Sequence, residues 1–381
     1  MAGHCKMPKV AIRTDASLQI GSGHVMRCLT LAAALRHRGA ECHFICRDLP
    51  GHLGELVLDR QFILHMLPPC RDSRTPDAGE PPAWLPSHAH WLGCSWQTDA
   101  QQSANLLGII QPDLLITDHY AIDARWHTAL SPHYERLMVI DDLADRPHLG
   151  DILLDQTFAR SPVDYAKYVP EDCLVLCGSR YALLRPEFAS LRAQSLRRRK
   201  SSAGIKHLLI TMGGIDKDNV TAQVLDALAG SGLPAACKIT IVMGMTAPWL
   251  DDIRARAASL PWCTRVRVNT RDMASIMASA DLCIGAAGST AWERCTLGLP
   301  TIMVITAANQ TGIAAALHGN GAAICAGPFD TPHFLQRLQA GMTHFLESPQ
   351  ALRAASAAAA EVTDGTGVDA VCNALLENVM Q

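Results

Sequence analysis

Short apolar runs alternate with helical patterns along the chain, and this alternation restricts the fold more than any other feature of the sequence. In the first half, strands are predicted at residues 9–12, 42–46, 114–117 and 137–140, and a helix is predicted over residues 24–38. Successive strands joined by helices pair in parallel, because each helix returns the chain to the starting edge of the sheet. The pattern therefore predicts a parallel sheet with helices on its faces.

The same alternation begins again after a short polar segment. The basic cluster at residues 197–200 and the serines that follow it are predicted to form a solvated linker. Beyond it, strands are predicted at residues 207–211, 238–243, 282–284 and 301–305, and helices at residues 219–228 and 290–297. We therefore expect an α/β protein of two Rossmann-like, doubly wound domains, residues 1–196 and 204–381, which face a ligand-binding cleft.

The composition argues against several classes of protein. The chain of 381 residues has 33 Lys and Arg against 36 Asp and Glu, and this balance argues against nucleic-acid binding. Residues 297–329 contain no Asp, Glu, Lys or Arg, but polar residues and Pro300 interrupt them. A buried strand and helix are therefore predicted there, with no membrane insertion. The first 15 residues lack the apolar run of a secretory signal, so a cytoplasmic location is expected.

The 14 cysteines do not have the spacing of a metal site or of a disulfide framework. No Cys-x-x-Cys occurs, so buried free thiols in a reducing compartment are expected. His88 and His90 lie in a proline-rich insertion, residues 68–90, without a third type of ligand beside them. We therefore predict neither a metal ion nor a cofactor, and we assign no role to the insertion.

A glycine-bearing turn precedes the first predicted helix. Gly21 and Gly23 allow backbone N–H groups to approach an anion, although the third glycine of a dinucleotide fingerprint is missing. His24 stands at the helix N-terminus, and both the helix dipole and Arg27, itself a candidate substrate contact, disfavour its imidazolium form. A neutral imidazole is what a general base requires. The alternative is a partly exposed first-turn histidine without a function.

Polar residues also follow the other predicted strands of the first half. Asp15, His119 and Tyr120 are candidate substrate contacts, because they come at strand ends that face the predicted cleft. Asp141 and Asp142 follow the next strand, and there the simpler interpretation is that they cap loops.

Three segments of the second half are candidates for nucleotide binding. Gly213 and Gly214 either cradle a diphosphate through backbone amides or form only a tight turn. Gly288, Ser289 and Thr290 form a second such loop, and Glu293 has the spacing to complete a capping box with Thr290. Alternatively, Glu293 accepts hydrogen bonds from ribose hydroxyls. Asn309, which Gln310 follows, is either a helix N-cap or an amide that reads a sugar or base.

One block of the sequence is specific enough to suggest a family. The segment RTDASLQIGSGHVMRC at residues 13–28 closely resembles the opening of the UDP-2,4-diacetamido-2,4,6-trideoxy-β-L-altropyranose hydrolases of pseudaminic acid biosynthesis. The resemblance covers nearly the whole chain outside the proline-rich insertion. The further similar blocks lie at residues 44–48, 91–93, 118–126, 140–146, 181–188, 285–293 and 309–310.

The resemblance implies a glycosyltransferase B architecture related to the UDP-N-acetylglucosamine transferase of peptidoglycan synthesis. It implies an enzyme that uses water to cleave the C1–O bond of a UDP-sugar, without a metal, and releases UDP and the free sugar. By the same resemblance His24 is the catalytic residue and Glu293 binds the ribose. Two alternatives are a glycosyltransferase that uses a UDP-sugar donor and a non-catalytic nucleotide-sugar-binding protein.

Overall fold

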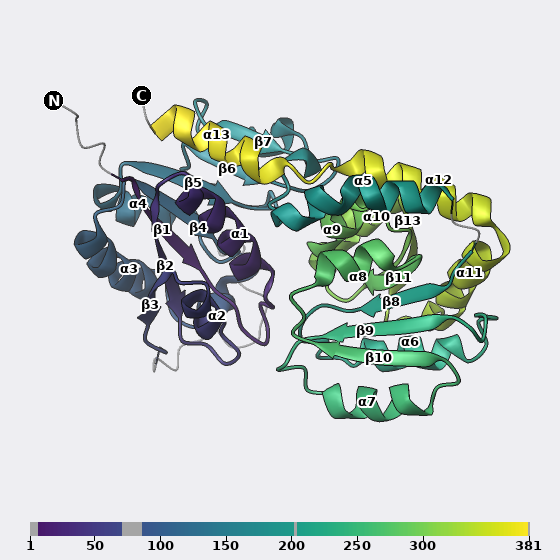
Figure 1. Ribbon diagram of the computed structural model, residues 1–381. Coiled ribbons are helices and arrows are strands. Elements are labelled where there is room, and N and C mark those ends of the chain that lie inside the picture. The colour runs from purple at the N-terminus through teal and green to yellow at the C-terminus, as the bar shows by residue number, and fades with distance from the viewer. Residues whose placement is uncertain (1–6, 71–85, 202–203, 380–381) are drawn as a thin grey trace. The chain divides into compact units, whose positions relative to one another are not determined.

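The computed structural model describes residues 7–70, 86–201 and 204–379, and these residues form two compact units (Figure 1). The first unit comprises Met1–Leu183 together with Val368–Gln381, and the second comprises Leu184–Gly367. Each unit is built on its own parallel sheet, as the alternation of the sequence predicts. Residues 71–85 of the proline-rich insertion lie outside the described part of the chain.

The described part of the first unit contains a seven-stranded sheet with the order β3-β2-β1-β4-β5-β6-β7. Every pair of neighbouring strands is parallel, and Ile12 of β1 lies between Phe44 of β2 and Ile116 of β4. The strands are β1 (Lys9–Thr14), β2 (Glu41–Arg47), β3 (Ile63–Leu67), β4 (Leu114–Asp118), β5 (Arg136–Ile140), β6 (Ile152–Asp155) and β7 (Leu174–Cys177). The helices and 3₁₀ turns are α1 (Gly23–His37), α2 (Gly54–Asp59), η1 (Ala89–Leu92), α3 (Trp96–Ile110), α4 (Ala124–Leu130), η2 (Ser131–His133), η3 (Pro162–Tyr165), η4 (Ser179–Tyr181) and α13 (Gly367–Val379).

Both faces of this sheet are covered by helices. Val10 and Ile12 point to one face, where they join a buried cluster with residues of α1 and with Val371 of α13. Ala11 points to the other face, where the cluster includes Leu107 of α3 and residues of α4. Successive side chains of a strand alternate between faces, so strands that are covered on both faces are apolar throughout.

The described part of the second unit contains a six-stranded parallel sheet with the order β10-β9-β8-β11-β12-β13. The strands are β8 (His207–Thr211), β9 (Lys238–Met243), β10 (Cys263–Val268), β11 (Leu282–Ala286), β12 (Thr301–Ile305) and β13 (Ala323–Pro328). The helices and the 3₁₀ turn are α5 (Pro186–Lys200), α6 (Val220–Leu228), α7 (Leu250–Ser259), α8 (Met273–Ser279), α9 (Thr290–Thr296), η5 (Ala308–Gln310), α10 (Thr311–Gly319), α11 (Phe334–Glu347) and α12 (Pro349–Val362).

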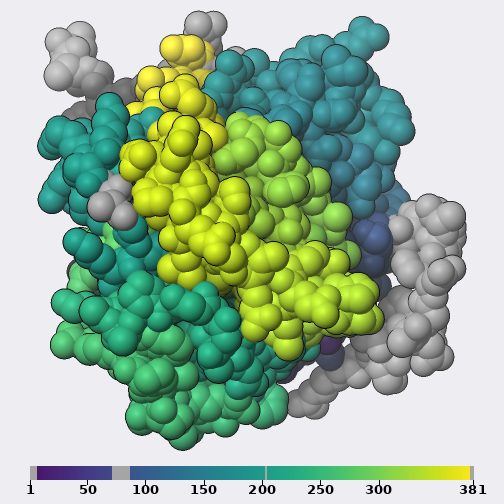
Figure 2. Space-filling model, turned by 90° about the vertical axis from the view of Figure 1, so that its right-hand side faces the viewer, coloured from purple at the N-terminus to yellow at the C-terminus, as the bar shows by residue number. Residues whose placement is uncertain are grey.

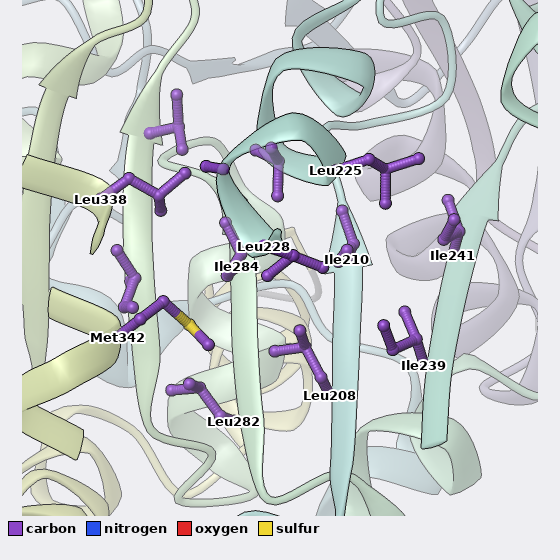
Figure 3. Packing of buried hydrophobic residues seen from close by; sticks show 14 of the residues in the cluster. Leu208, Ile210, Leu225, Leu228, Ile239, Ile241, Leu282, Ile284, Leu338 and Met342 are labelled. Carbon is purple, nitrogen blue, oxygen red and sulfur yellow. The ribbon is translucent and has the colours of Figure 1, made fainter. Parts of the chain in front are cut away.

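The core of the second unit lies between this sheet and its helices. Figure 3 shows Ile210 of β8 and Ile284 of β11 among side chains of α6 and α11, such as Leu225 and Leu338. On the opposite face, residues of α5 and α8 pack against alternate residues of the same strands. Figure 2 shows α11 and α12, which contact each other, at the yellow end of the colour scale on the surface.

Both sheets have the strand order that the predicted Rossmann-like fold requires. In each sheet the order reverses beside the first strand, between β1 and β4 in the first unit and between β8 and β11 in the second. Ligands of doubly wound sheets bind outside the carboxyl ends of the strands at this point. The ends of β1, β4, β8 and β11 are therefore where functional side chains are expected.

The boundary between the units differs from the predicted one. The basic cluster at residues 197–200 forms the last turn of α5 and belongs to the second unit. Arg199 is buried, and its guanidinium donates to the backbone oxygens of Met277, Ala280 and Leu297. These carbonyls lie at the C-terminal ends of α8 and α9, where a cation is favourable, so the prediction of a solvated linker is wrong.

The end of the chain also differs from the prediction. The predicted second domain runs to residue 381, whereas α13 packs its residues Val368, Val371 and Leu375 into the core of the first unit. By contrast, residues 297–329 form β12 and α10, the predicted strand and helix. In the described part of the chain, no helix has the length and apolar character needed to span a membrane.

Candidate active site

The first unit brings His24 and Asp118 together in a close polar contact. His24 is the second residue of α1, and Asp118 is the last residue of β4. The Nδ1 atom of His24 lies 2.6 Å from Oδ1 of Asp118, and both side chains are buried. His24 is a predicted site residue, but nothing in the sequence connects it with Asp118, which is 94 positions away.

Arg27 holds the same carboxylate from one turn further along α1. Its Nε donates to Oδ2 of Asp118 and its Nη2 donates to Oδ1, both at 2.6 Å. A third nitrogen, Nη1, donates to Asp142 at 3.1 Å. Burial would raise the pKa of Asp118, but the charge of Arg27 and the hydrogen bonds from Arg27 and His24 hold this pKa well below its usual range. Asp118 is therefore an ionised, acceptor-only group at neutral pH.

Because Asp118 is ionised, it determines which nitrogen of His24 carries a proton. Because the carboxylate can only accept, the 2.6 Å contact requires His24 to donate through Nδ1. The Nε2 atom of a neutral His24 is then the nitrogen with a free lone pair. This is the arrangement of a histidine that a carboxylate orients for general-base catalysis.

Aromatic side chains form a wall beside His24. The ring of Tyr120 meets the His24 ring edge to face, with centroids 4.6 Å apart, and the indole of Trp91 stacks on Tyr120 at 5.4 Å. His88 contacts both Trp91 and Tyr120. Sequence analysis includes Tyr120 among the substrate contacts but not Trp91, which lies in η1 after the proline-rich insertion.

Asp15 and His119 belong to a buried ionic network of the same unit. The carboxylate of Asp15 receives two hydrogen bonds from Arg13 and one from the backbone N–H of Arg47. The Nε2 atom of His119 lies 3.3 Å from Asp15, and its Nδ1 accepts from the backbone of Ala121. Both side chains are almost inaccessible to solvent, so this geometry favours a supporting role over the predicted direct contact with substrate.

Of the two carboxylates that follow β5, Asp141 holds a loop, as its simpler interpretation predicts, whereas Asp142 does not. Asp141 accepts from the backbone N–H groups of Leu143 and Ala144 and is 2.9 Å from Nη1 of Arg146. Asp142, in contrast, is the outer partner of Arg27 and so belongs to the periphery of the His24 cluster.

The predicted glycine turns have the backbone conformations that require glycine. Gly21 has a φ of 80° and its N–H donates to the carbonyl of Ser17, which closes the turn before α1. Gly213 has a φ of 91° at the end of β8, in the left-handed region that other residues avoid. The carbonyl of Gly214 accepts from the N–H of Gly244, which follows β9. Gly23 is the first residue of α1.

The second predicted loop of the second unit connects β11 to α9. A Cβ atom added to Gly288 would lie 3.7 Å from Nε2 of Gln310, so these two predicted site residues are neighbours. The Oε1 atom of Gln310 accepts from the backbone N–H and the hydroxyl of Thr306. Ser289 is the residue before α9, and its side chain makes no capping hydrogen bond.

Glu293 does not form a capping box with Thr290. Its carboxylate faces Arg185, with Oε1 3.7 Å from Nη2, and the Thr290 hydroxyl instead accepts from Arg294. Burial raises the pKa of Glu293 to about 7, with Arg185 and Arg294 acting in the opposite direction. Asn309 is exposed and is not the N-cap of α10, since Gln310 occupies that position. Both residues are therefore available for ligands.

Metal ligation finds no support in the described residues. Within this part of the chain, no three His, Cys, Asp or Glu side chains converge in a way that could hold a metal ion. His88 contacts the aromatic wall, and the prediction of metal independence remains a prediction.

Solved structures identify the class to which this fold belongs. The structure of MurG from Acinetobacter baumannii matches with a TM-score of 0.67 and 16% identity, and covers 97% of this chain and 99% of that one. Arabidopsis thaliana UGT89C1 complexed with UDP-L-rhamnose matches with a TM-score of 0.62 and 13% identity, over 97% and 99% of the two chains. The chain thus has the glycosyltransferase B fold.

The sequence comparisons identify the family. The glycosyltransferase family 28 C-terminal domain matches residues 173–367, slightly more than half of the chain. The chain therefore belongs to this family and is an enzyme of the glycosyltransferase-like type.

Curated relatives of the chain come from archaea and bacteria. An uncharacterized protein of Methanocaldococcus jannaschii is 23% identical over 78% of this chain, which spans 55% of that relative's length. The UDP-2,4-diacetamido-2,4,6-trideoxy-β-L-altropyranose hydrolase of Campylobacter jejuni is 28% identical over 76% of this chain and 88% of its own length. The spore coat polysaccharide biosynthesis protein SpsG of Bacillus subtilis is 26% identical over 42% of this chain and 46% of its own.

Proposed function

We propose that the protein hydrolyses UDP-2,4-diacetamido-2,4,6-trideoxy-β-L-altropyranose, or a closely similar UDP-sugar, in pseudaminic acid biosynthesis. Water would attack C1 of the sugar, and the bond from C1 to the diphosphate oxygen would break. The products are UDP and the free sugar. The observation that carries this proposal is the His24–Asp118 contact, because it provides a base that could activate water.

In the proposed reaction His24 acts as the general base. Its Nε2 takes a proton from the water as the water oxygen bonds to C1, and the leaving diphosphate keeps the electron pair of the broken bond. Asp118 stabilises the imidazolium that forms and fixes the orientation of the ring. Tyr120 and Trp91, which line the same site, would contact the apolar parts of the sugar.

The second unit would bind the UDP moiety. Both of its candidate loops, Gly213–Gly214 and residues 286–290, follow the strands at which the sheet order reverses. Backbone amides of these loops would hold the diphosphate, and the Glu293 carboxylate would accept hydrogen bonds from the ribose hydroxyls. Asn309 and Gln310, next to the second loop, are proposed contacts of the sugar or base.

The likeness to the Campylobacter jejuni hydrolase supports this reaction over transfer to an acceptor, since it extends over 88% of that enzyme. Family membership and fold are equally compatible with the second candidate, a glycosyltransferase that uses a UDP-sugar donor. A non-catalytic nucleotide-sugar-binding protein would have no need of the buried pair formed by His24 and Asp118.

The experiment that distinguishes these functions is incubation of the protein with the UDP-sugar alone. Proton NMR should show stoichiometric release of UDP and free sugar. The first-formed anomer should be inverted at C1, because a single displacement by water attacks opposite to the leaving group. UDP release that requires an added acceptor alcohol would identify a transferase, and binding without turnover would identify a binding protein.

A further inference from the structure

Arg294 is a buried arginine directly beneath the loop that connects β11 to α9. Its relative exposure is 1%, and it is among the largest fully buried side chains of the described residues. The Nη2 atom donates to the carbonyl of Ala286 at 2.8 Å, and the Nη1 atom donates to the hydroxyl of Thr290 at 3.1 Å. The guanidinium thus holds both ends of the loop formed by residues 286–290.

No carboxylate of the described residues lies within 4.0 Å of this guanidinium. Arg13 and Arg27 differ, since each pairs with aspartates, whereas Arg199 also lacks a carboxylate contact and donates to three backbone carbonyls at helix ends. Glu293, the adjacent residue, has Arg185 within 4.0 Å, and the charge of Arg294 lowers its pKa without a contact at that distance. A buried charge without an opposite charge beside it is costly, so a fold retains one where something else offsets that cost.

The interior of the unit does not supply the missing anion. The small cavity beside Arg294 is lined mainly by apolar residues, among them Cys295, Leu299 and Met303. Gly285 of β11 leaves room for the guanidinium, since a Cβ atom there would lie 2.8 Å from Nη1 of Arg294. The side of Arg294 that faces this cavity therefore offers no anion, whereas two of its nitrogens donate to the loop.

We propose that the charge of Arg294 is balanced by the diphosphate of the bound nucleotide on the other side of this loop. Arg294 is then a positioning residue, which acts through the loop and does not itself touch the ligand. The inference rests on the proposed function, in which the second unit binds UDP. It adds that the protein discriminates UDP from the uncharged nucleoside largely through a buried cation.

Calorimetry with UDP and with uridine tests this directly, because the two ligands share the base and ribose but differ in charge. In the wild type UDP should bind more tightly than uridine. In Arg294→Met the ratio of the two affinities should fall by about 10-fold or more, the scale of losing one charge-assisted interaction, while uridine affinity changes little. Arg294→Lys, which keeps the charge, should retain part of the ratio.

Arg199→Met is the matched control, because Arg199 is also buried in the same unit but donates to other backbone oxygens than those of the loop. Its ratio of affinities should equal that of the wild type. If Arg294→Met does not fold, Gly285→Ala, which displaces the guanidinium, should lower the same ratio. Equal losses of UDP and uridine affinity in the Arg294 variants would overturn the inference while leaving the proposed function intact. Failure of the wild type to bind UDP would overturn both.

Discussion

The imidazole of His24 donates through Nδ1 to a carboxylate of Asp118 that is 2.6 Å away and that two nitrogens of Arg27 also hold. The two residues come from different elements, α1 and β4, which meet because β1 and β4 are neighbours in the sheet. The contact orients the ring and leaves Nε2 as its reactive atom. It therefore links the strand order of the first unit to the proposed chemistry.

Asp118→Asn should lower turnover by about 10²-fold or more, because an amide neither stabilises the imidazolium nor fixes the required tautomer. UDP affinity should remain close to that of the wild type, since the nucleotide is proposed to bind the second unit. Steady-state kinetics together with calorimetry for UDP measure both effects.

The matched control for that variant is Asp142→Asn. Asp142 contacts Arg27 at the periphery of the cluster but does not touch His24. Its effect on turnover should be much smaller than that of Asp118→Asn. Similar losses in the two variants would mean that the charge around Arg27 matters and the His24–Asp118 contact does not.

Glu293→Ala should weaken UDP binding by about 1–3 kcal/mol, the scale of losing hydrogen bonds to a charged group. The control is Glu187→Ala, which removes the other carboxylate beside Arg185 from a half-buried position. Titration calorimetry at constant pH checks both variants. Unchanged affinity in a folded Glu293→Ala protein would remove the ribose-binding role.

The affinity for UDP should also depend on the protonation of Glu293. Its pKa is raised to about 7, and only the ionised carboxylate can accept hydrogen bonds from both ribose hydroxyls. Affinity should therefore fall as the pH is lowered through this value. Because phosphate groups titrate nearby, the informative quantity is the difference between the wild type and Glu293→Gln, which should vanish at low pH.

Chelation should not reduce turnover. The sequence has no cluster with the spacing of metal ligands, and the described side chains do not converge on such a site. Rates measured before and after exhaustive treatment with EDTA should agree. A loss that one divalent metal restores would show that the diphosphate is stabilised by a cation that this account does not include.

The first unit should lose stability in mild acid because of its buried histidines. Burial lowers the pKa of His148 from 6.5 to about 4, and the pKa of His127 is also well below 6.5. As the pH falls from 6.5 to 4, these two histidines become protonated in the unfolded chain while they stay largely neutral in the native state. His148 alone can then cost up to about 3 kcal/mol by pH 4, and His127 acts in the same direction.

Comparison with His148→Phe isolates this contribution, because Asp155 has a pKa raised to about 6 and acts in the opposite direction over part of the range. Denaturant unfolding at several pH values should show a variant whose stability falls less steeply in acid than that of the wild type. Substitution of the exposed His37 by Phe should leave the slope unchanged.

The central strands of both sheets could be predicted from the sequence because they are buried on both faces and are therefore continuously apolar. β10 could not be predicted in this way, because neither of its faces is fully buried. It lies at a sheet edge, where Arg265 and Arg267 alternate with half-buried residues, so no apolar run marks it. The return of α13 to the first unit could not be predicted either, because a local apolar face does not specify its partner.

The candidate site, like the fold, could be predicted only in part from the sequence. His24 and Arg27 could be predicted from the glycine turn and the first turn of the helix, and Tyr120 from its position after a strand; the structure places the three in one cluster. Asp118 was not connected with His24, because that contact depends on which strands are neighbours. The role of Arg294 could not be inferred from its type, since only burial without a carboxylate partner distinguishes it from a surface arginine.

The central claim is that His24 activates water for attack on C1, and one measurement tests it most directly. Wild type and His24→Asn are incubated with the UDP-sugar in ¹⁸O-labelled water without an acceptor, and products are analysed by mass spectrometry. The account predicts that the wild type places ¹⁸O in the sugar and none in UDP. It also predicts that His24→Asn binds UDP normally but turns over at least about 10²-fold more slowly. Label in UDP, or a near-normal rate in His24→Asn, would contradict the account.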